Sequence, residues 1–75
     1  LPEDMPERSL SEPTGLVEII YLAGMADSKS EVRRLIKGGG VRLDGRKVQD
    51  IKLLVEPGGE QVIQVGRRRF LRITN

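Results

Sequence analysis

The chain has no cysteine, no histidine and no tryptophan among its 75 residues, and it has one tyrosine and one phenylalanine. Without cysteine there is no disulfide framework and no thiolate metal site. Without histidine the chain lacks the commonest general base and the commonest transition-metal ligand. We therefore predict no catalytic residue, no metal site and no cofactor in this chain.

Long apolar runs are also missing from the sequence. No stretch approaches the roughly 18 apolar residues of a membrane span, and the N-terminal segment lacks the pattern of a signal peptide. We therefore expect no membrane partner and a cytoplasmic location. Because the chain begins with Leu1 instead of methionine, we expect it to be a piece of a longer protein.

Charge is distributed unevenly, although the net charge is only +2. Residues 1–31 carry seven acidic side chains and two basic ones, whereas residues 32–75 carry four acidic and eleven basic side chains. A basic half of this kind favours a polyanionic partner such as a nucleic acid. An ordinary solvated surface is the alternative interpretation of the same charges.

The first 14 residues differ in composition from the rest. They contain three of the four prolines (Pro2, Pro6 and Pro13) and few large apolar side chains. Such a composition is typical of a linker or tail. We predict that residues 1–14 join an upstream domain, absent here, to a folded domain over residues 15–75.

Two short helices are predicted at the start of that domain. Thr14 is the expected N-cap of a helix over residues 15–24, in which apolar side chains recur at helical spacing. A second helix begins at Ser28, which forms an S-x-x-E capping box with Glu31. Gly38 is the expected residue at which this helix ends.

The second helix carries a set of cations opposite its apolar side, and these are Lys29, Arg33, Arg34 and Lys37. Glu31 is the only acidic residue among them, and the capping box accounts for it. The free N–H groups of a helix N-terminus also attract phosphate. We predict that this face contacts RNA or DNA, with a plain solvated helix face as the alternative.

A small sheet is predicted after the helices. Residues 41–43 and 46–48 flank Asp44-Gly45, which is a strong signal for a β-hairpin with a type I′ turn. Further strands are expected at 51–55, 61–65 and 70–74. The fold class is therefore α+β, with two short helices followed by a small, mostly antiparallel sheet.

The predicted hairpin and a later turn add cations to the candidate site. Arg42, Arg46 and Lys47 come from the hairpin and are predicted to contact the nucleic acid with the helix. Ser30 is a further candidate contact. The run Arg67, Arg68 and Arg69 is equally consistent with a solvated turn and with phosphate contacts.

Other chemistries fit the sequence less well. Asp44 and Asp50 are weak candidates for a catalytic carboxylate pair, because no nucleophile or base accompanies them. The glycines at 38–40 follow a helix instead of preceding one, and no GKS or GKT motif comes after them, so they do not resemble a phosphate loop. With so few aromatic side chains, the chain is expected to bind folded RNA through shape and phosphates instead of stacking single strands.

The order of these segments resembles the RNA-binding fold named after ribosomal protein S4, also called the alpha-L motif. Within that superfamily the chain is similar to the C-terminal domains of bacterial tyrosyl-tRNA synthetases. The resemblance is carried by "DMPE" at 4–7, "LVEIIYLAGMADSKSEVRRLIKGGGVRLDGRKVQD" at 16–50, "VIQVGRRRF" at 62–70 and "LRI" at 71–73. The triple glycine and Val32 are minor departures from the family pattern.

The resemblance implies a tRNA-binding domain that catalyses nothing itself and follows a catalytic domain, its partner in a parent tyrosine–tRNA ligase. It implies that the RNA is tRNA-Tyr. It also implies that ATP binds to the parent enzyme and not to this domain. The alternatives are an S4-like domain of a ribosome-associated or RNA-modifying protein, a DNA-binding helix-turn-helix, and a protein-interaction module without nucleic acid.

Overall fold

The computed structural model describes residues 5–74 of the chain. These residues form seven strands and two helices: β1 (Glu7–Ser9), β2 (Thr14–Gly15), α1 (Leu16–Leu22), α2 (Lys29–Lys37), β3 (Val41–Leu43), β4 (Arg46–Lys47), β5 (Leu54–Val55), β6 (Gln61–Val65) and β7 (Arg69–Thr74). The predicted α+β class is confirmed. Two short strands, however, precede the helices that were expected to come first.

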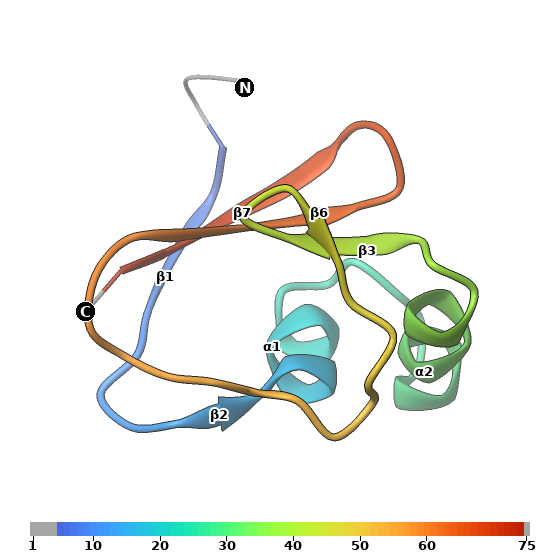
Figure 1. Ribbon diagram of the computed structural model, residues 1–75, viewed down its shortest axis with the longest axis horizontal. Helices are drawn as coiled ribbons and strands as arrows, with labels where there is room; N and C mark the ends of the chain where they lie inside the picture. Colours follow the sequence, from blue (N-terminus) through green and yellow to red (C-terminus); the bar gives the residue numbers. More distant parts are fainter. Residues whose placement is uncertain (1–4, 75) are drawn as a thin grey trace.

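The main sheet has the strand order β1-β7-β6-β3-β4, and both helices lie on one of its faces (Figure 1). Strands β3, β4, β6 and β7 pair antiparallel, whereas β1 runs parallel to β7. Strictly alternating side chains of β6 and β7 are buried toward the helices, namely Ile63, Val65, Leu71 and Ile73. This alternation is what a sheet covered on one face requires.

Residues 5–14 belong to the folded body, in contrast to the linker predicted over residues 1–14. The segment Glu7–Ser9 forms β1, and its register with β7 pairs Glu7 with Arg72. Met5 and Leu10, on either side of β1, are buried. Composition gave no sign of this strand because its own three side chains are exposed. Residues 1–4 lie outside the described range.

Helix α1 packs its apolar stripe into the core as predicted, but it begins differently. Leu16, Ile19 and Ile20 are at most 1% exposed. The N-cap is Gly15, which makes no side-chain cap bond. Thr14 lies in β2 instead, with its hydroxyl donating to the carbonyl oxygen of Glu12.

The strand predicted over residues 51–55 is reduced to Leu54–Val55. It pairs with β2 in a separate two-stranded sheet. The shortening has a local cause in Asp50, whose Oδ1 accepts a hydrogen bond from the Lys52 amide at 2.9 Å while its carbonyl accepts from Leu53. A side chain that closes its own turn in this way competes with strand pairing.

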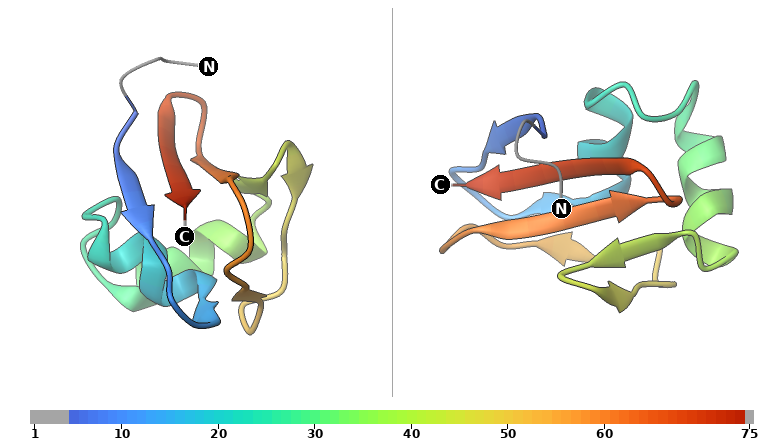
Figure 2. Two further views of the ribbon diagram at one scale, coloured as in Figure 1. Left: turned by 90° about the vertical axis from the view of Figure 1, so that its left-hand side faces the viewer. Right: turned by 90° about the horizontal axis from the view of Figure 1, so that it is seen from above.

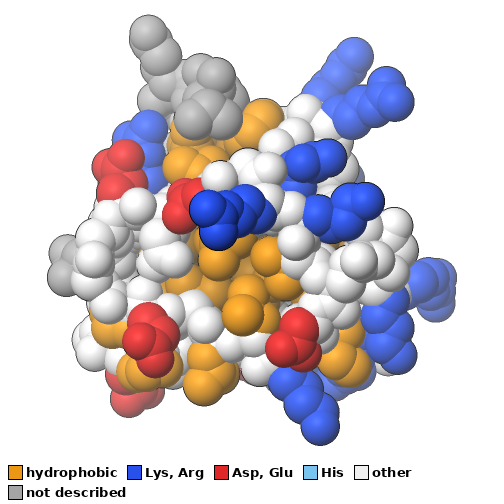
Figure 3. Space-filling model, in the orientation of Figure 1, with side chains coloured by type: hydrophobic (Ala, Val, Ile, Leu, Met, Phe, Trp, Pro, Cys, Tyr) orange, Lys and Arg blue, Asp and Glu red, His pale blue; other side chains and the backbone are white. Residues whose placement is uncertain are grey.

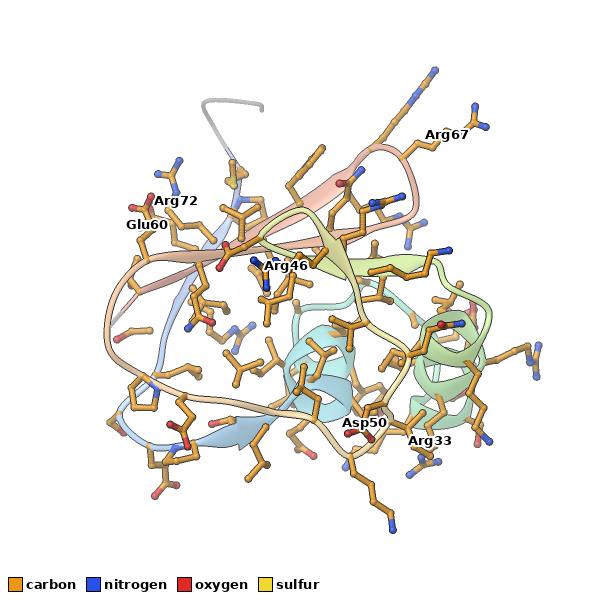
Figure 4. All side chains as sticks on the ribbon, in the orientation of Figure 1. Arg33, Arg46, Asp50, Glu60, Arg67 and Arg72 are labelled. Atoms are coloured by element: carbon orange, nitrogen blue, oxygen red, sulfur yellow. The ribbon has the colours of Figure 1, made fainter. Side chains whose placement is uncertain are left out.

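Strand β1 lies beside β7 at the edge of the main sheet that is away from α2 (Figure 2). Arg72 of β7 bonds Glu7 of β1 at 3.1 Å, and its Nε lies 3.9 Å from Glu60 (Figure 4). These contacts hold the β1 edge of the sheet. Strand β4 forms the opposite edge of the sheet. The β3–β4 hairpin follows α2 directly in the chain and belongs to the candidate site.

Candidate nucleic-acid interface

Helix α2 begins at the predicted cap. Ser28 has an extended backbone, and its Oγ accepts a hydrogen bond from the Glu31 amide at 3.2 Å. Val32 and Ile36 are fully buried. Because these two residues fix which side of the helix faces the core, the cations between them are held on the solvent side.

Three of the four helix cations are free to meet a ligand. Arg33, Arg34 and Lys37 are exposed. Within residues 5–74, ion pairs join Lys29 to Glu18 and Arg72 to Glu7 and Glu60, so none involves these three side chains. Arg33 points away from the body of the molecule at the lower end of the view (Figure 4).

Lys29 is placed differently from the other helix cations. Its Nζ lies 2.8 Å from Glu18 Oε2 and 5.7 Å from the centre of the Tyr21 ring, and both partners belong to α1. The Glu18 carboxylate therefore offsets part of the positive charge of Lys29. Ser30, in the same first turn, is exposed.

The three glycines after α2 make a precise helix stop. Gly38 keeps a helical backbone, whereas Gly39 has φ +80°. The Gly39 amide donates to Ile36 and the Gly40 amide donates to Leu35, which is the Schellman pattern. The left-handed residue is thus Gly39, one position after the glycine that was predicted to end the helix.

The glycine link lets the hairpin lie against the end of α2. A side chain at Gly39 would meet Lys47 Cδ at 3.2 Å, so the stem of Lys47 lies directly over the link. The Gln49 side-chain amide donates to the Lys37 carbonyl at 3.2 Å. Both contacts fix the hairpin relative to the last turn of α2.

The hairpin itself has the predicted geometry. Asp44 and Gly45 both have positive φ, as a type I′ turn requires. Lys47 pairs with Arg42, whose Nη1 bonds the Gly45 carbonyl. Arg46 pairs with Leu43 beside the turn, at the end of the hairpin remote from the glycine link. The structure therefore brings Lys47 to α2 and leaves Arg46 at the margin.

The arginine run of the β6–β7 turn reaches the same end of the domain. The Gly66 amide donates to the Gly40 carbonyl at 2.8 Å, which sets the turn beside the glycine link. Arg67 and Arg68 are exposed in this turn, and Arg67 points outward from it (Figure 4). Arg69 begins β7, and its Nη1 donates to the Met25 carbonyl. Arg69 is thus a structural contact, unlike its two neighbours.

These elements together give the molecule a basic side. Figure 3 shows Lys and Arg side chains gathered on the right of the view, over α2, the β3–β4 hairpin and the β6–β7 turn, while most acidic side chains lie to the left and below. We define the basic side by six exposed cations that form none of the ion pairs above, and these are Arg33, Arg34, Lys37, Lys47, Arg67 and Arg68. Lys29, Arg42 and Arg46 lie at its margins.

The two candidate catalytic carboxylates, Asp44 and Asp50, accept hydrogen bonds from backbone amides. Asp44 Oδ1 accepts from the Val62 amide at 2.9 Å, and Asp50 Oδ1 holds its own turn. Over the described range 5–74, no group of three acidic side chains is placed to hold a metal ion. In the same range, neither helix is long and apolar enough to cross a membrane.

A β-sheet with two helices on one face and a basic helix–glycine–hairpin unit at one end places the chain in a known class. A family model described as the S4 domain matches residues 14–62, and the chain belongs to that family. S4 domains bind RNA. The crystal structure of 30S ribosomal protein S4e from Thermoplasma acidophilum has a similar fold, with a TM-score of 0.58 and 28% identity over 75% of this chain and 29% of that one.

Similar sequences occur in tyrosine–tRNA ligases. The chain is 45% identical to a tyrosine–tRNA ligase of Thermotoga maritima over 99% of its own length, and 48% identical to that of Desulfotalea psychrophila over 97%. It spans only 18% of the length of each of these relatives. The resemblance to tyrosyl-tRNA synthetases inferred from the sequence is confirmed.

Sequence reasoning missed the residues that assemble the basic side. Gln49 and Gly66 join its parts through hydrogen bonds that are 12 and 26 positions apart in sequence. No local pattern signals such contacts. The positive charges were visible in the sequence, but the position of Arg67 and Arg68 beside the glycine link depends on the register of β3 with β6, in which Val41 pairs with Val65.

Proposed function

We propose that this chain is the tRNA-binding domain of a tyrosine–tRNA ligase, that it is non-catalytic by itself, and that it binds tRNA-Tyr through the basic side. The observation that carries the proposal is the convergence of three segments, α2, the hairpin and the β6–β7 turn, on one surface of unpaired cations. The relatives named above, all tyrosine–tRNA ligases, support the identity of the RNA.

The mechanism follows from the charges. The cations of the basic side project from a helix, a hairpin and a turn that hydrogen bonds join to one another, and they present their charges together to the phosphates of a folded RNA. We propose that the catalytic domain of the parent enzyme precedes this domain in the chain and activates tyrosine with ATP. We also propose that the parent enzyme is cytoplasmic. The role of this domain is to hold the tRNA so that its acceptor end reaches that catalytic domain.

Fluorescence anisotropy tests the proposal. The chain is titrated with a labelled tRNA-Tyr transcript, and a tRNA without the long variable arm competes. We expect a preference for the long-armed tRNA. With about five phosphate contacts, the slope of log affinity against log salt should be roughly −3.5 to −4.5. A nearly flat slope would exclude a phosphate-based mechanism.

Charge reversals locate the site. Arg33→Glu and Lys37→Glu, made singly, should each weaken binding roughly tenfold at low salt. Arg8→Glu is the matched control, because β1 and β4 form opposite edges of the main sheet and the charge change is the same. Equal effects of all three variants would point to net charge alone, and preferential binding of ribosomal RNA fragments would favour a ribosome-associated protein.

A further inference from the structure

A hollow of about 420 Å³ lies beside the basic side, between the start of β7, residues 5–6 and the loop that joins the helices. Its apolar lining comes from Met5, Met25 and Phe70, and Arg68 and Arg69 contribute cations. Its size falls within the range of sites that accept a small ligand.

Part of the wall of the hollow is packed into the body of the domain. Met25 and Met5 are 8% and 7% exposed, and the Arg69 guanidinium is fixed by its hydrogen bond to the Met25 carbonyl. Phe70 is partly exposed. An aromatic ring and two thioethers offer a flat, polarisable group a surface on which to stack. Arg68, exposed in the adjoining turn, supplies a positive charge at the same place.

This combination of an apolar pocket and an adjacent cation matches one nucleotide, with a flat base whose face can stack and a negative phosphate. We propose that the hollow receives a single unstacked base of the bound RNA, which packs against Phe70 while Arg68 contacts its phosphate. The inference rests on the proposed RNA-binding function and extends it. Arg67 and Arg68 share the turn that adjoins Gly40, so an RNA on the basic side passes directly by the hollow.

One base is what the aromatic content allows. Modules that bind single strands stack successive bases on several aromatic side chains. The chain has one phenylalanine and one tyrosine, and the Tyr21 ring lies 5.7 Å from Lys29 Nζ and does not line the hollow. The hollow therefore adds one base contact to a binding mode that otherwise depends on phosphates.

The methionines provide a direct probe of the hollow. The chain has two methionines, and both line the hollow. Carbon-13 labelling of the methionine methyl groups of the 75-residue chain thus gives two NMR signals, each reporting on this site. A nucleobase stacked within the hollow shifts both signals through its ring current. The probes are a tRNA-Tyr transcript and, as a control with phosphates but no bases, inorganic polyphosphate.

We expect tRNA-Tyr to shift both methyl signals and polyphosphate to leave them in place, while both probes shift backbone amides of α2. If tRNA moves the α2 amides without moving the methyl signals, the hollow is not a base site, although the proposed function stands. If tRNA moves neither, the proposed function itself fails. Methyl shifts that depend on protein concentration without RNA would assign the hollow to a second copy of the chain.

Substitution of the ring gives an independent test. Phe70→Leu keeps an apolar side chain but loses the stacking surface, and it should weaken tRNA-Tyr binding about fivefold or more. Phe70→Tyr keeps the ring and should bind like the original chain. Both variants are compared after a cooperative unfolding transition has been recorded for each. Equal affinity of Phe70→Leu and Phe70→Tyr would overturn the proposal.

Discussion

The amide of Gly66 donates a hydrogen bond of 2.8 Å to the carbonyl oxygen of Gly40. This contact joins the turn that carries Arg67 and Arg68 to the glycine link behind α2. Three basic segments that are separate in the sequence therefore present one surface. Since phosphate contacts in several places fix the position of an RNA better than one cluster does, this junction is central to the proposed mode of binding.

Of the three glycines in the link, Gly39 is predicted to tolerate substitution least. Gly39→Ala places a side chain at φ +80° and 3.2 Å from Lys47 Cδ. We expect it to destabilise the domain by about 1–2 kcal/mol, which lowers Tm by roughly 4–8 °C per kcal/mol in a domain of this size. Thermal unfolding followed by circular dichroism measures this.

Gly38→Ala is the matched control for that substitution. Gly38 has φ −79°, a conformation that alanine adopts freely. A Cβ at Gly38 would lie 3.2 Å from the Arg34 carbonyl oxygen, but it would carry no left-handed strain, so Gly38→Ala should lose less stability than Gly39→Ala. If both variants lose the same stability, the left-handed conformation of Gly39 is not what the link requires.

The helix cap gives a second stability prediction. Ser28→Ala removes the acceptor of the Glu31 amide and should cost about 1 kcal/mol. Ser30→Ala, at an exposed position within the same helix, should cost nothing, because alanine favours a helix more than serine does. Urea unfolding of the two variants distinguishes them, and a larger loss for Ser30→Ala would contradict the assignment of the cap.

Much of the local structure could be predicted from the sequence, and the reasons are specific. The cap at Ser28, the hairpin turn at Asp44-Gly45 and the strands 61–65 and 70–74 depend on neighbouring residues, and all are present. Strand β1 depends on a partner 65 positions away in the Glu7–Arg72 pair. Its three exposed side chains leave no periodic pattern, so composition alone indicated a linker.

The candidate site also has features that local sequence predicts and features that depend on tertiary contacts. The exposed cations of α2 were identified from helical spacing, which orients side chains within one helix. Spacing cannot show that Lys29 is engaged by Glu18, or that Arg69 bonds the carbonyl of Met25 while Arg67 points to solvent. Those differences arise from tertiary contacts.

Lys29 is predicted to contribute less to RNA affinity than Arg34. The Glu18 carboxylate 2.8 Å away offsets part of its charge. Lys29→Ala should therefore weaken tRNA binding less than Arg34→Ala does. Glu18→Gln, which frees Lys29, should strengthen binding about two- to fivefold, the range expected for an exposed ion pair. Anisotropy titrations at one salt concentration test this, and weaker binding by Glu18→Gln would contradict it.

The arginines of the β6–β7 turn should separate binding from stability. Arg67→Ala is expected to reduce the salt slope of tRNA binding by about 1 and to leave Tm unchanged. Arg69→Ala removes the hydrogen bond to Met25 and should lower Tm, with a smaller change in the salt slope. The reverse pattern would show that the two roles have been exchanged.

The most direct measurement of the central claim is a map of backbone amide shifts in the nitrogen-15-labelled chain during titration with tRNA-Tyr. If the basic side binds the RNA, the largest changes fall together on α2, around Lys47 and in the turn at 66–68, while β1, β2 and β5 change little. Changes concentrated on β1 or on the β2–β5 pair, with α2 unaffected, would contradict the account.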